Sequence, residues 1–134
     1  MRSRPDVLLA VAAGGALGGL ARHGLASAFP VRAGAFPWTT LVVNVSGSFV
    51  LGVVAVLAAA RWPGRRLLRP FLGVGFCGGY TTWSTAMAET VLLARDHHAP
   101  TATAYLVAGL LAAPAAALFG LLLTAARLDP GGGT

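Results

Sequence analysis

Charged residues are scarce in this chain of 134 residues. Only 10% of its residues are charged, whereas soluble domains carry about 25%, and 56% are hydrophobic. Charge is absent or nearly absent from four stretches, residues 7–29, 38–60, 70–88 and 97–126. Each stretch has roughly the 20 residues that an α-helix needs to cross a bilayer. These runs exclude a soluble globular domain and predict an integral membrane protein.

Lysine is absent, and cysteine occurs once, at Cys77. A single cysteine excludes an internal disulfide and a cysteine-based metal site, so we interpret Cys77 as a small packing residue. All ten basic residues are arginines, and the net charge is +6. In a soluble protein this charge would suggest nucleic-acid binding. Here the arginines cluster at the ends of the apolar stretches, which favours topology signals beside lipid headgroups and no nucleic-acid partner.

Acidic residues number only four, and most of them lie near the ends of the apolar stretches or in loops. No two carboxylates are paired within a stretch, and the three histidines lack the His-x-x-x-His spacing of metal ligands. No G-x-S-x-G motif and no phosphate-cradling loop occurs. The sequence therefore does not predict an enzyme.

We predict an all-α fold of four transmembrane helices, at residues 6–28, 38–60, 67–94 and 99–126. They form one domain, residues 1–127, and we expect the glycine-rich tail, residues 128–134, to be disordered. The N-terminal basic residues and apolar run also suit a cleaved signal peptide, but the three apolar stretches that follow favour a retained helix.

Small residues at four-residue spacing predict close helix packing, because they let helix backbones approach each other in lipid. The pairs are Gly14 with Gly18, Gly15 with Gly19, Ser48 with Gly52, and Gly75 with Gly79.

The arginines also predict an orientation. Four spans place seven arginines on the side of both termini, namely Arg2, Arg4, Arg61, Arg65, Arg66, Arg69 and Arg127. The other side has Arg32, Arg95 and, if it is counted, Arg22. Because cytoplasmic flanks carry the positive excess, we expect both termini to be cytoplasmic in a multi-pass protein of the plasma membrane.

Polar side chains at membrane depth usually face a bundle interior or a water-filled path. Arg22 is one candidate; the alternative is an arginine that only reaches the interface. Asn44 is another, with Ser48 one turn later on the same helix face. Its amide has two donors that suit an anion, although it equally suits a hydrogen bond that only holds helices together.

The stretch "GFCGGYTTWSTAMAET", residues 75–90, is the third candidate. We expect the third helix to break near Gly78 and Gly79, because glycine is unfavourable in helices and a break frees backbone carbonyls for a cation. Hydroxyl residues then surround Trp83, whose ring edge is positive and suits a small anion. The alternative is that the two glycines only allow close packing.

Together these residues resemble the bacterial CrcB, or Fluc, fluoride channels. Motifs of the kind "GGxxGxxxR", "TLxVNxxGSFxxG" and "GxxGGxTTFSTF" match residues 14–22, 40–52 and 75–86 in order. The resemblance implies a passive, fluoride-selective channel that protects the cell from fluoride, built as an antiparallel dimer of four-helix subunits. It also implies a structural sodium ion at the dimer centre, held by the backbone carbonyls of Gly78 and Thr81.

The resemblance further assigns the fluoride pore. Donors that match Asn44, Ser84 and Thr85 would line it, together with the ring edge of Trp83, and Arg22 would lie at a vestibule. The second aromatic residue of the family motif is alanine here, at Ala86, so half of the aromatic pair is missing.

Seven arginines against three also predict a single orientation of this chain in the membrane. An antiparallel dimer would then require a homologous subunit of opposite orientation, and we expect such a distinct partner.

Two other functions remain open. A small four-helix, proton-coupled exporter needs a membrane-embedded carboxylate, and Glu89, late in the third helix, is the one candidate. A non-conducting paralogous subunit of a heteromeric membrane assembly would use Asn44 and the hydroxyls only to hold helices together.

Overall fold

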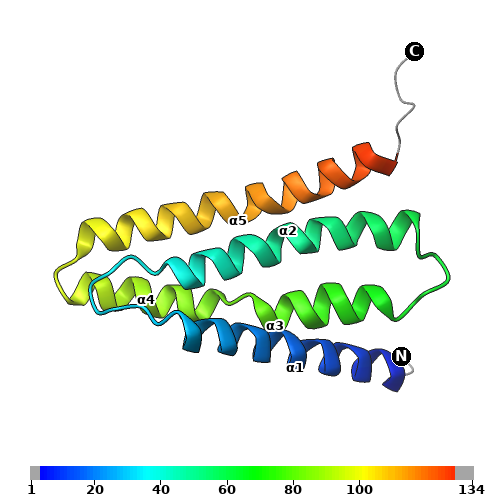
Figure 1. The fold of residues 1–134 in the computed structure, drawn as a ribbon, viewed down its shortest axis with the longest axis horizontal. Coiled ribbons are helices and arrows are strands. Elements are labelled where there is room, and N and C mark those ends of the chain that lie inside the picture. Colours follow the sequence, from blue (N-terminus) through cyan, green and yellow to red (C-terminus); the bar gives the residue numbers. More distant parts are fainter. Residues whose placement is uncertain (1–3, 129–134) are drawn as a thin grey trace, which may run out of the picture.

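The computed structural model describes residues 4–128, and its elements are all helical (Figure 1). They are α1 (Pro5–Ala28), α2 (Trp38–Ala60), η1 (Pro70–Cys77), α3 (Gly78–Tyr80), α4 (Trp83–Arg95) and α5 (Ala99–Leu128). The tail from residue 129 and the first three residues, Arg2 among them, lie outside the described part. Both ends of the described chain lie at the same end of the molecule (Figure 1).

Three of the four predicted helices match the structure closely. Residues 38–60 form α2 as predicted, and α1 begins one residue earlier than expected. Helix α5 continues to Leu128, two residues beyond the predicted end at residue 126. These three helices are long and apolar enough to cross a membrane. The chain is thus a multi-pass membrane protein.

The third predicted helix, residues 67–94, is divided in the structure. It begins at Pro70 as η1, which has the wide i→i+5 hydrogen bonding of a π-helix, and continues through the short α3. Two extended residues then separate α3 from α4. Proline at the first position is favourable here and at Pro5, since the first N–H groups of a helix have no partner within it.

Helix α1 packs against η1 and α3 through glycines (Figure 1). A Cβ atom on Gly14 or Gly18 would overlap backbone atoms of residues 71–80, and one on Gly75 would lie 2.7 Å from the carbonyl oxygen of Val11. Gly79 faces the backbone of Gly15 in the same way. The predicted close approach is confirmed for these glycines.

Helix α2 packs along α5 in the same manner (Figure 1). A Cβ atom on Gly52 would overlap the backbone of α5 at Ala117, and one on Gly120 would overlap the backbone of α2 at Phe49. Gly19 differs, because no atom lies within 4 Å of the place where its Cβ would stand, so its predicted packing role was wrong.

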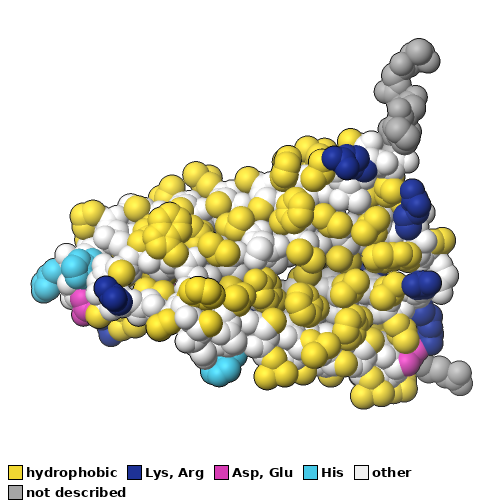
Figure 2. All heavy atoms as spheres, viewed as in Figure 1, with side chains coloured by type: hydrophobic (Ala, Val, Ile, Leu, Met, Phe, Trp, Pro, Cys, Tyr) yellow, Lys and Arg dark blue, Asp and Glu magenta, His cyan; other side chains and the backbone are white. Residues whose placement is uncertain are grey.

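The outer surface is apolar along the helices and charged at the two ends (Figure 2). Large side chains such as Leu9, Val74 and Leu111 are 65–70% exposed on the helix faces. A smaller buried cluster of Ala86, Leu93, Ala102 and Tyr105 joins α4 to α5. Exposed apolar faces of this extent suit a lipid surrounding.

Candidate functional site

The interruption between α3 and α4 lies at Thr81 and Thr82. Both residues are extended, with φ/ψ of −78°/156° and −150°/116°. Gly78 is helical, with φ/ψ of −65°/−36°, and Gly79 also belongs to α3. The break expected at the two glycines is therefore two to three residues further along the chain. Thr82 favours this position because its hydroxyl caps α4, accepting the N–H of Thr85.

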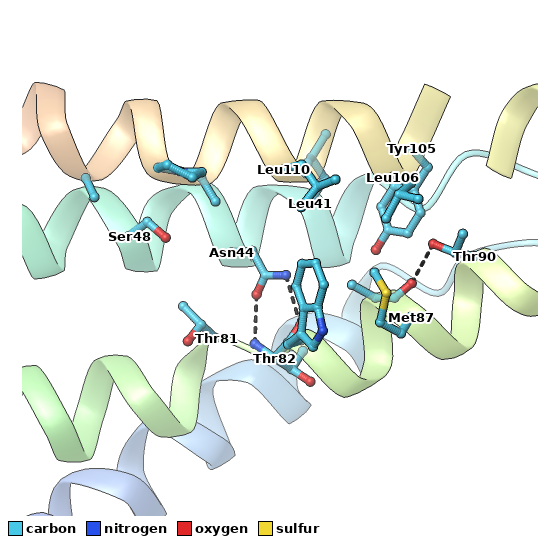
Figure 3. Close-up of a pocket in the computed structure, with 16 residues that line it drawn as sticks. Leu41, Asn44, Ser48, Thr81, Thr82, Met87, Thr90, Tyr105, Leu106 and Leu110 are labelled. Atoms are coloured by element: carbon cyan, nitrogen blue, oxygen red, sulfur yellow. Dashed lines mark hydrogen bonds between the residues drawn. The ribbon is translucent and has the colours of Figure 1, made fainter. Parts of the chain in front are cut away.

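Asn44 of α2 holds the extended segment in place (Figure 3). Its Nδ2 donates to the carbonyl oxygen of Thr82 at 3.0 Å, and its Oδ1 accepts the N–H of Thr82 at 2.7 Å. The amide thus replaces two hydrogen bonds that a continuous helix would have made within the backbone. One of its two N–H donors remains for another acceptor.

The break frees backbone carbonyls of their usual donors. In a continuous helix the N–H groups of Thr82 and Thr85 would bond to the carbonyls of Gly78 and Thr81. Here they donate instead to Asn44 Oδ1 and to Thr82 Oγ1. The carbonyl of Gly79, also beside the break, accepts the Nε–H of Arg22 at 3.2 Å. The guanidinium of Arg22 thus reaches the break from α1.

The hydroxyls after the break form a small network. Thr82 Oγ1 donates to Thr85 Oγ1 at 2.9 Å and lies 3.3 Å from Ser84 Oγ. Ser84 is exposed and Thr85 is half-buried. The network stabilises the first turn of α4.

A cavity of about 340 Å³ lies between α2, α4, α5 and the extended segment (Figure 3). Its polar lining residues are Asn44, Ser48, Thr81, Thr82, Thr90 and Tyr105. Trp83 and Ala86 also line it, whereas Ser84 and Thr85 do not belong to the lining. The structure therefore brings Asn44, Trp83 and Ala86 to one cavity and leaves the other two predicted pore residues beside it.

Trp83 and Ala86 contribute differently to this cavity. The Trp83 side chain is 59% exposed, so most of its ring faces outward from this chain. Ala86 is 8% exposed and packs in the cluster with Tyr105. The small side chain of Ala86 leaves open the part of the cavity that a larger residue would fill.

A second polar group links α2, α4 and α5 around Glu89. It was not predicted from the sequence. Thr40 Oγ1 of α2 donates to Glu89 Oε1 at 2.8 Å, and the Tyr105 hydroxyl of α5 donates to Oε2 at 2.6 Å. Thr40 and Tyr105 are buried. The spacing of Thr40, Asn44 and Ser48, four residues apart on one helix face, is the signal that would have singled out Thr40.

The Tyr105–Glu89 bond leads to a stability prediction. Tyr105→Phe should lower the free energy of unfolding by about 1–3 kcal/mol, because it leaves one half-buried carboxylate oxygen without its donor. Thermal unfolding in detergent measures the effect. Tyr80→Phe is the control, since it removes a 3.2 Å hydrogen bond between two neutral hydroxyls, Tyr80 and Ser46, and leaves no carboxylate without a donor. Equal melting temperatures for the two variants would contradict the role of this bond.

The fold and this site define a class: a multi-pass helical membrane protein in which polar side chains from several helices meet at an interrupted helix. Residues 9–121 match the model of the family described as CrcB-like protein, Camphor Resistance (CrcB). The chain belongs to this family.

Curated relatives of the family carry a functional name. The protein named fluoride-specific ion channel FluC 2 of Streptomyces avermitilis is 49% identical over 104 residues, which cover 78% of this chain and 66% of the relative. FluC 3 of the same organism is 50% identical over 99 residues, 73% of this chain and 48% of the relative. FluC 2 of Nocardia farcinica is 44% identical over 116 residues, 87% and 83% of the two chains.

The chain thus spans less than two thirds of the length of both Streptomyces relatives. These relatives are named as ion channels, so the family is one of transport proteins and not of enzymes.

Proposed function

We propose that this chain is a subunit of a fluoride-selective channel that lets fluoride leave the cell passively and so confers fluoride resistance. The observation that supports this most is the pairing of Asn44 with the extended Thr82, which holds an amide and several hydroxyls at a break at membrane depth. The names of the relatives in the same family supply the ion.

The chemistry of the cavity suits a small, strongly hydrated anion. Fluoride leaves water only where donors replace its hydration at close range. The hydroxyls of Thr90 and Tyr105 border the cavity, but they already donate to the Ala86 carbonyl and to Glu89 Oε2. The remaining N–H of Asn44 and the hydroxyl of Ser48 also border it, as donors for an anion. In this proposal they take the place of water, while Ser84, Thr85 and the outward ring of Trp83 contribute once a partner subunit covers them. Arg22 sets a positive potential near the break.

The carbonyls of Gly78 and Thr81 fit the proposed structural sodium ion. Both residues line a second cavity, of about 360 Å³, and both carbonyls lie beside the break without the N–H donors of a continuous helix. A Cβ on Gly78 would meet nothing within 4 Å, so this face is open. A bound cation would neutralise the facing carbonyl dipoles.

The sodium proposal also requires a dimer. Hard cations such as Ca²⁺ and Mg²⁺ take about six or more oxygen ligands, and two carbonyls are too few for such a shell. An antiparallel partner whose own break faces this one would supply further carbonyls at the dimer centre.

The distribution of arginines supports a proposal for the partner. Among the described residues six arginines lie at the end with both termini, whereas Arg32 and Arg95 lie at the other end. We propose that both termini are cytoplasmic in the plasma membrane and that a distinct homologous subunit inserts the other way. The two numbered relatives of Streptomyces avermitilis are consistent with paired subunits.

Fluoride efflux from liposomes tests the function. Vesicles loaded with potassium fluoride and treated with valinomycin should release fluoride when they contain this chain with a homologous subunit of opposite orientation. Matched vesicles loaded with potassium chloride should not release chloride. A leak no faster than in protein-free vesicles would refute the channel. Full-rate efflux through both pores with this chain alone would refute the distinct partner but keep the channel.

Ala86 gives a second prediction. Ala86→Phe should raise the fluoride efflux of this chain, because it adds an aromatic ring, with its positive edge, to the lining of the cavity that Trp83 also borders. Ala86→Leu is the matched control, since it adds bulk without a ring. Initial efflux rates at equal protein density measure the effect. If both variants give the same rate, the aromatic edge is not what this position lacks.

A proton-coupled exporter differs from a channel in whether it can move its substrate against a gradient. Such a carrier accumulates its substrate against a gradient when a pH difference is imposed across the vesicle, whereas a channel only dissipates a fluoride gradient. Loss of fluoride resistance in cells that lack the gene would argue against the non-conducting subunit.

A further inference from the structure

The end of the molecule that carries both termini is strongly basic (Figure 2). Its arginines in the described part are Arg4, Arg61, Arg65, Arg66, Arg69 and Arg127. Among the three described carboxylates only Asp6 lies at this end, because Glu89 and Asp96 belong to the far part of α4 and the turn after it. Positive charge at this end is therefore largely uncompensated by the described residues.

Two of these arginines border an open groove. It has a volume of about 520 Å³ and lies between α1 and the connection that leads into η1. Its apolar wall includes Ala10, Leu67 and Phe71, and Arg65 and Arg66 lie at its charged side. The groove thus combines an apolar wall with guanidinium groups at one end of the membrane-spanning helices.

The two arginines are not equivalent. Arg66 forms an ion pair with Asp6 at the start of α1, and its side chain is 62% exposed. This is the one ion pair that the structure contains between residues 4 and 128, so Arg65 has no carboxylate partner among them. Arg65 is exposed and free to bind an external anion.

We propose that this groove binds an anionic phospholipid, with its phosphate on Arg65 and Arg66 and an acyl chain along Ala10, Leu67 and Phe71. Charge complementarity selects an anion, since guanidinium groups bind phosphate in a forked geometry. The apolar wall selects a lipid over a free phosphate, because only a lipid covers that surface. Basic pockets beside membrane helices bind anionic headgroups on the same physical grounds. The proposal is independent of the ion that the protein conducts.

Native mass spectrometry of the purified protein in detergent tests the site. Phosphatidylglycerol should bind more tightly than phosphatidylcholine of the same acyl chains. Arg65→Gln should weaken phosphatidylglycerol binding about fivefold. Ala10→Trp should weaken it without changing any charge, because the indole fills the groove. Asp6→Asn should strengthen it, because it releases Arg66 from its ion pair.

Arg127→Gln is the matched control, since Arg127 lies at the same end but does not line the groove. It should leave binding unchanged. Three results would each overturn the proposal: equal affinity for the two lipids, equal losses in Arg127→Gln and Arg65→Gln, or displacement of phosphatidylglycerol by inorganic phosphate. The last result would indicate a site for free anions. Arg65 is exposed, so Arg65→Gln is expected to fold and the test does not depend on the Ala10 variant.

Discussion

Asn44→Leu should reduce fluoride efflux about tenfold or more, which corresponds to an increase of at least about 1.4 kcal/mol in the barrier to permeation. The leucine removes both hydrogen bonds to Thr82 and leaves a backbone N–H and a carbonyl without partners at membrane depth. Each orphaned group costs about 1–3 kcal/mol of folding free energy. Efflux per folded protein and thermal unfolding in detergent measure the two consequences separately.

Asn44→Asp separates the acceptor from the donor. A carboxylate still accepts the N–H of Thr82 but has no N–H to give to the Thr82 carbonyl or to an anion. We expect this variant to lose efflux as fully as Asn44→Leu. Thr103→Ala is the control, because that exposed hydroxyl bonds only to Ala99 of its own helix.

The outcome of the Asn44 variants also decides between two roles. If Asn44→Leu melts earlier but each folded protein still conducts at the original rate, the amide only holds the break in place. If efflux and melting temperature both stay unchanged, the pairing with Thr82 has neither role.

Gly18→Val should lower the free energy of unfolding by about 3 kcal/mol or more, the largest stability effect that we expect. A Cβ atom at Gly18 would lie 2.8 Å from the backbone N of Tyr80 and would overlap the carbonyl of Phe76. Backbone atoms cannot rotate away, so α1 would have to separate from η1 and α3. Melting temperature and the monodisperse fraction in size-exclusion chromatography measure the loss.

The neighbouring glycine provides a matched control for this prediction. Gly19 lies one residue further along the same helix, and no atom stands within 4 Å of its Cβ position. Gly19→Val should therefore melt close to the unmodified protein. Equal destabilisation by the two substitutions would show that valine harms α1 for a reason other than its contact with α3.

Separation of α1 would also disturb the break. Arg22 reaches the Gly79 carbonyl only because α1 lies against α3, and Gly18 lies one turn before Arg22. We therefore expect the folded fraction of Gly18→Val to show slower efflux as well.

The sequence by itself was sufficient for the helices and for their membrane character. Long runs without charge require helices in lipid, since backbone groups must then be satisfied within the segment. The ends of those runs placed α1, α2 and α5 to within one or two residues. Small residues four apart likewise predicted the close approach at Gly14, Gly18 and Gly79, because such spacing creates one smooth helix face.

The candidate site was predicted in its members but not in its arrangement. Asn44 was singled out as a polar group at depth, yet its main contact is the Thr82 backbone, 38 residues away in the chain. Glu89 was noted only as the one candidate for an embedded carboxylate. Nothing in the sequence around Glu89 indicated that Thr40 and Tyr105 would be its donors. Such pairings depend on how helices are stacked, which no local pattern encodes.

The position of the break shows most clearly what the local sequence determines and what the tertiary contacts determine. Glycine propensity placed it at Gly78 and Gly79, because propensity describes a residue in isolation. In the folded chain α1 packs closely against Gly79, which is helical, while Asn44 and the capping hydroxyl of Thr82 stabilise the extended residues that follow. Local sequence therefore determined that this helix would be interrupted, and only the contacts with α1 and α2 decided where, because those contacts satisfy the backbone groups that the interruption exposes.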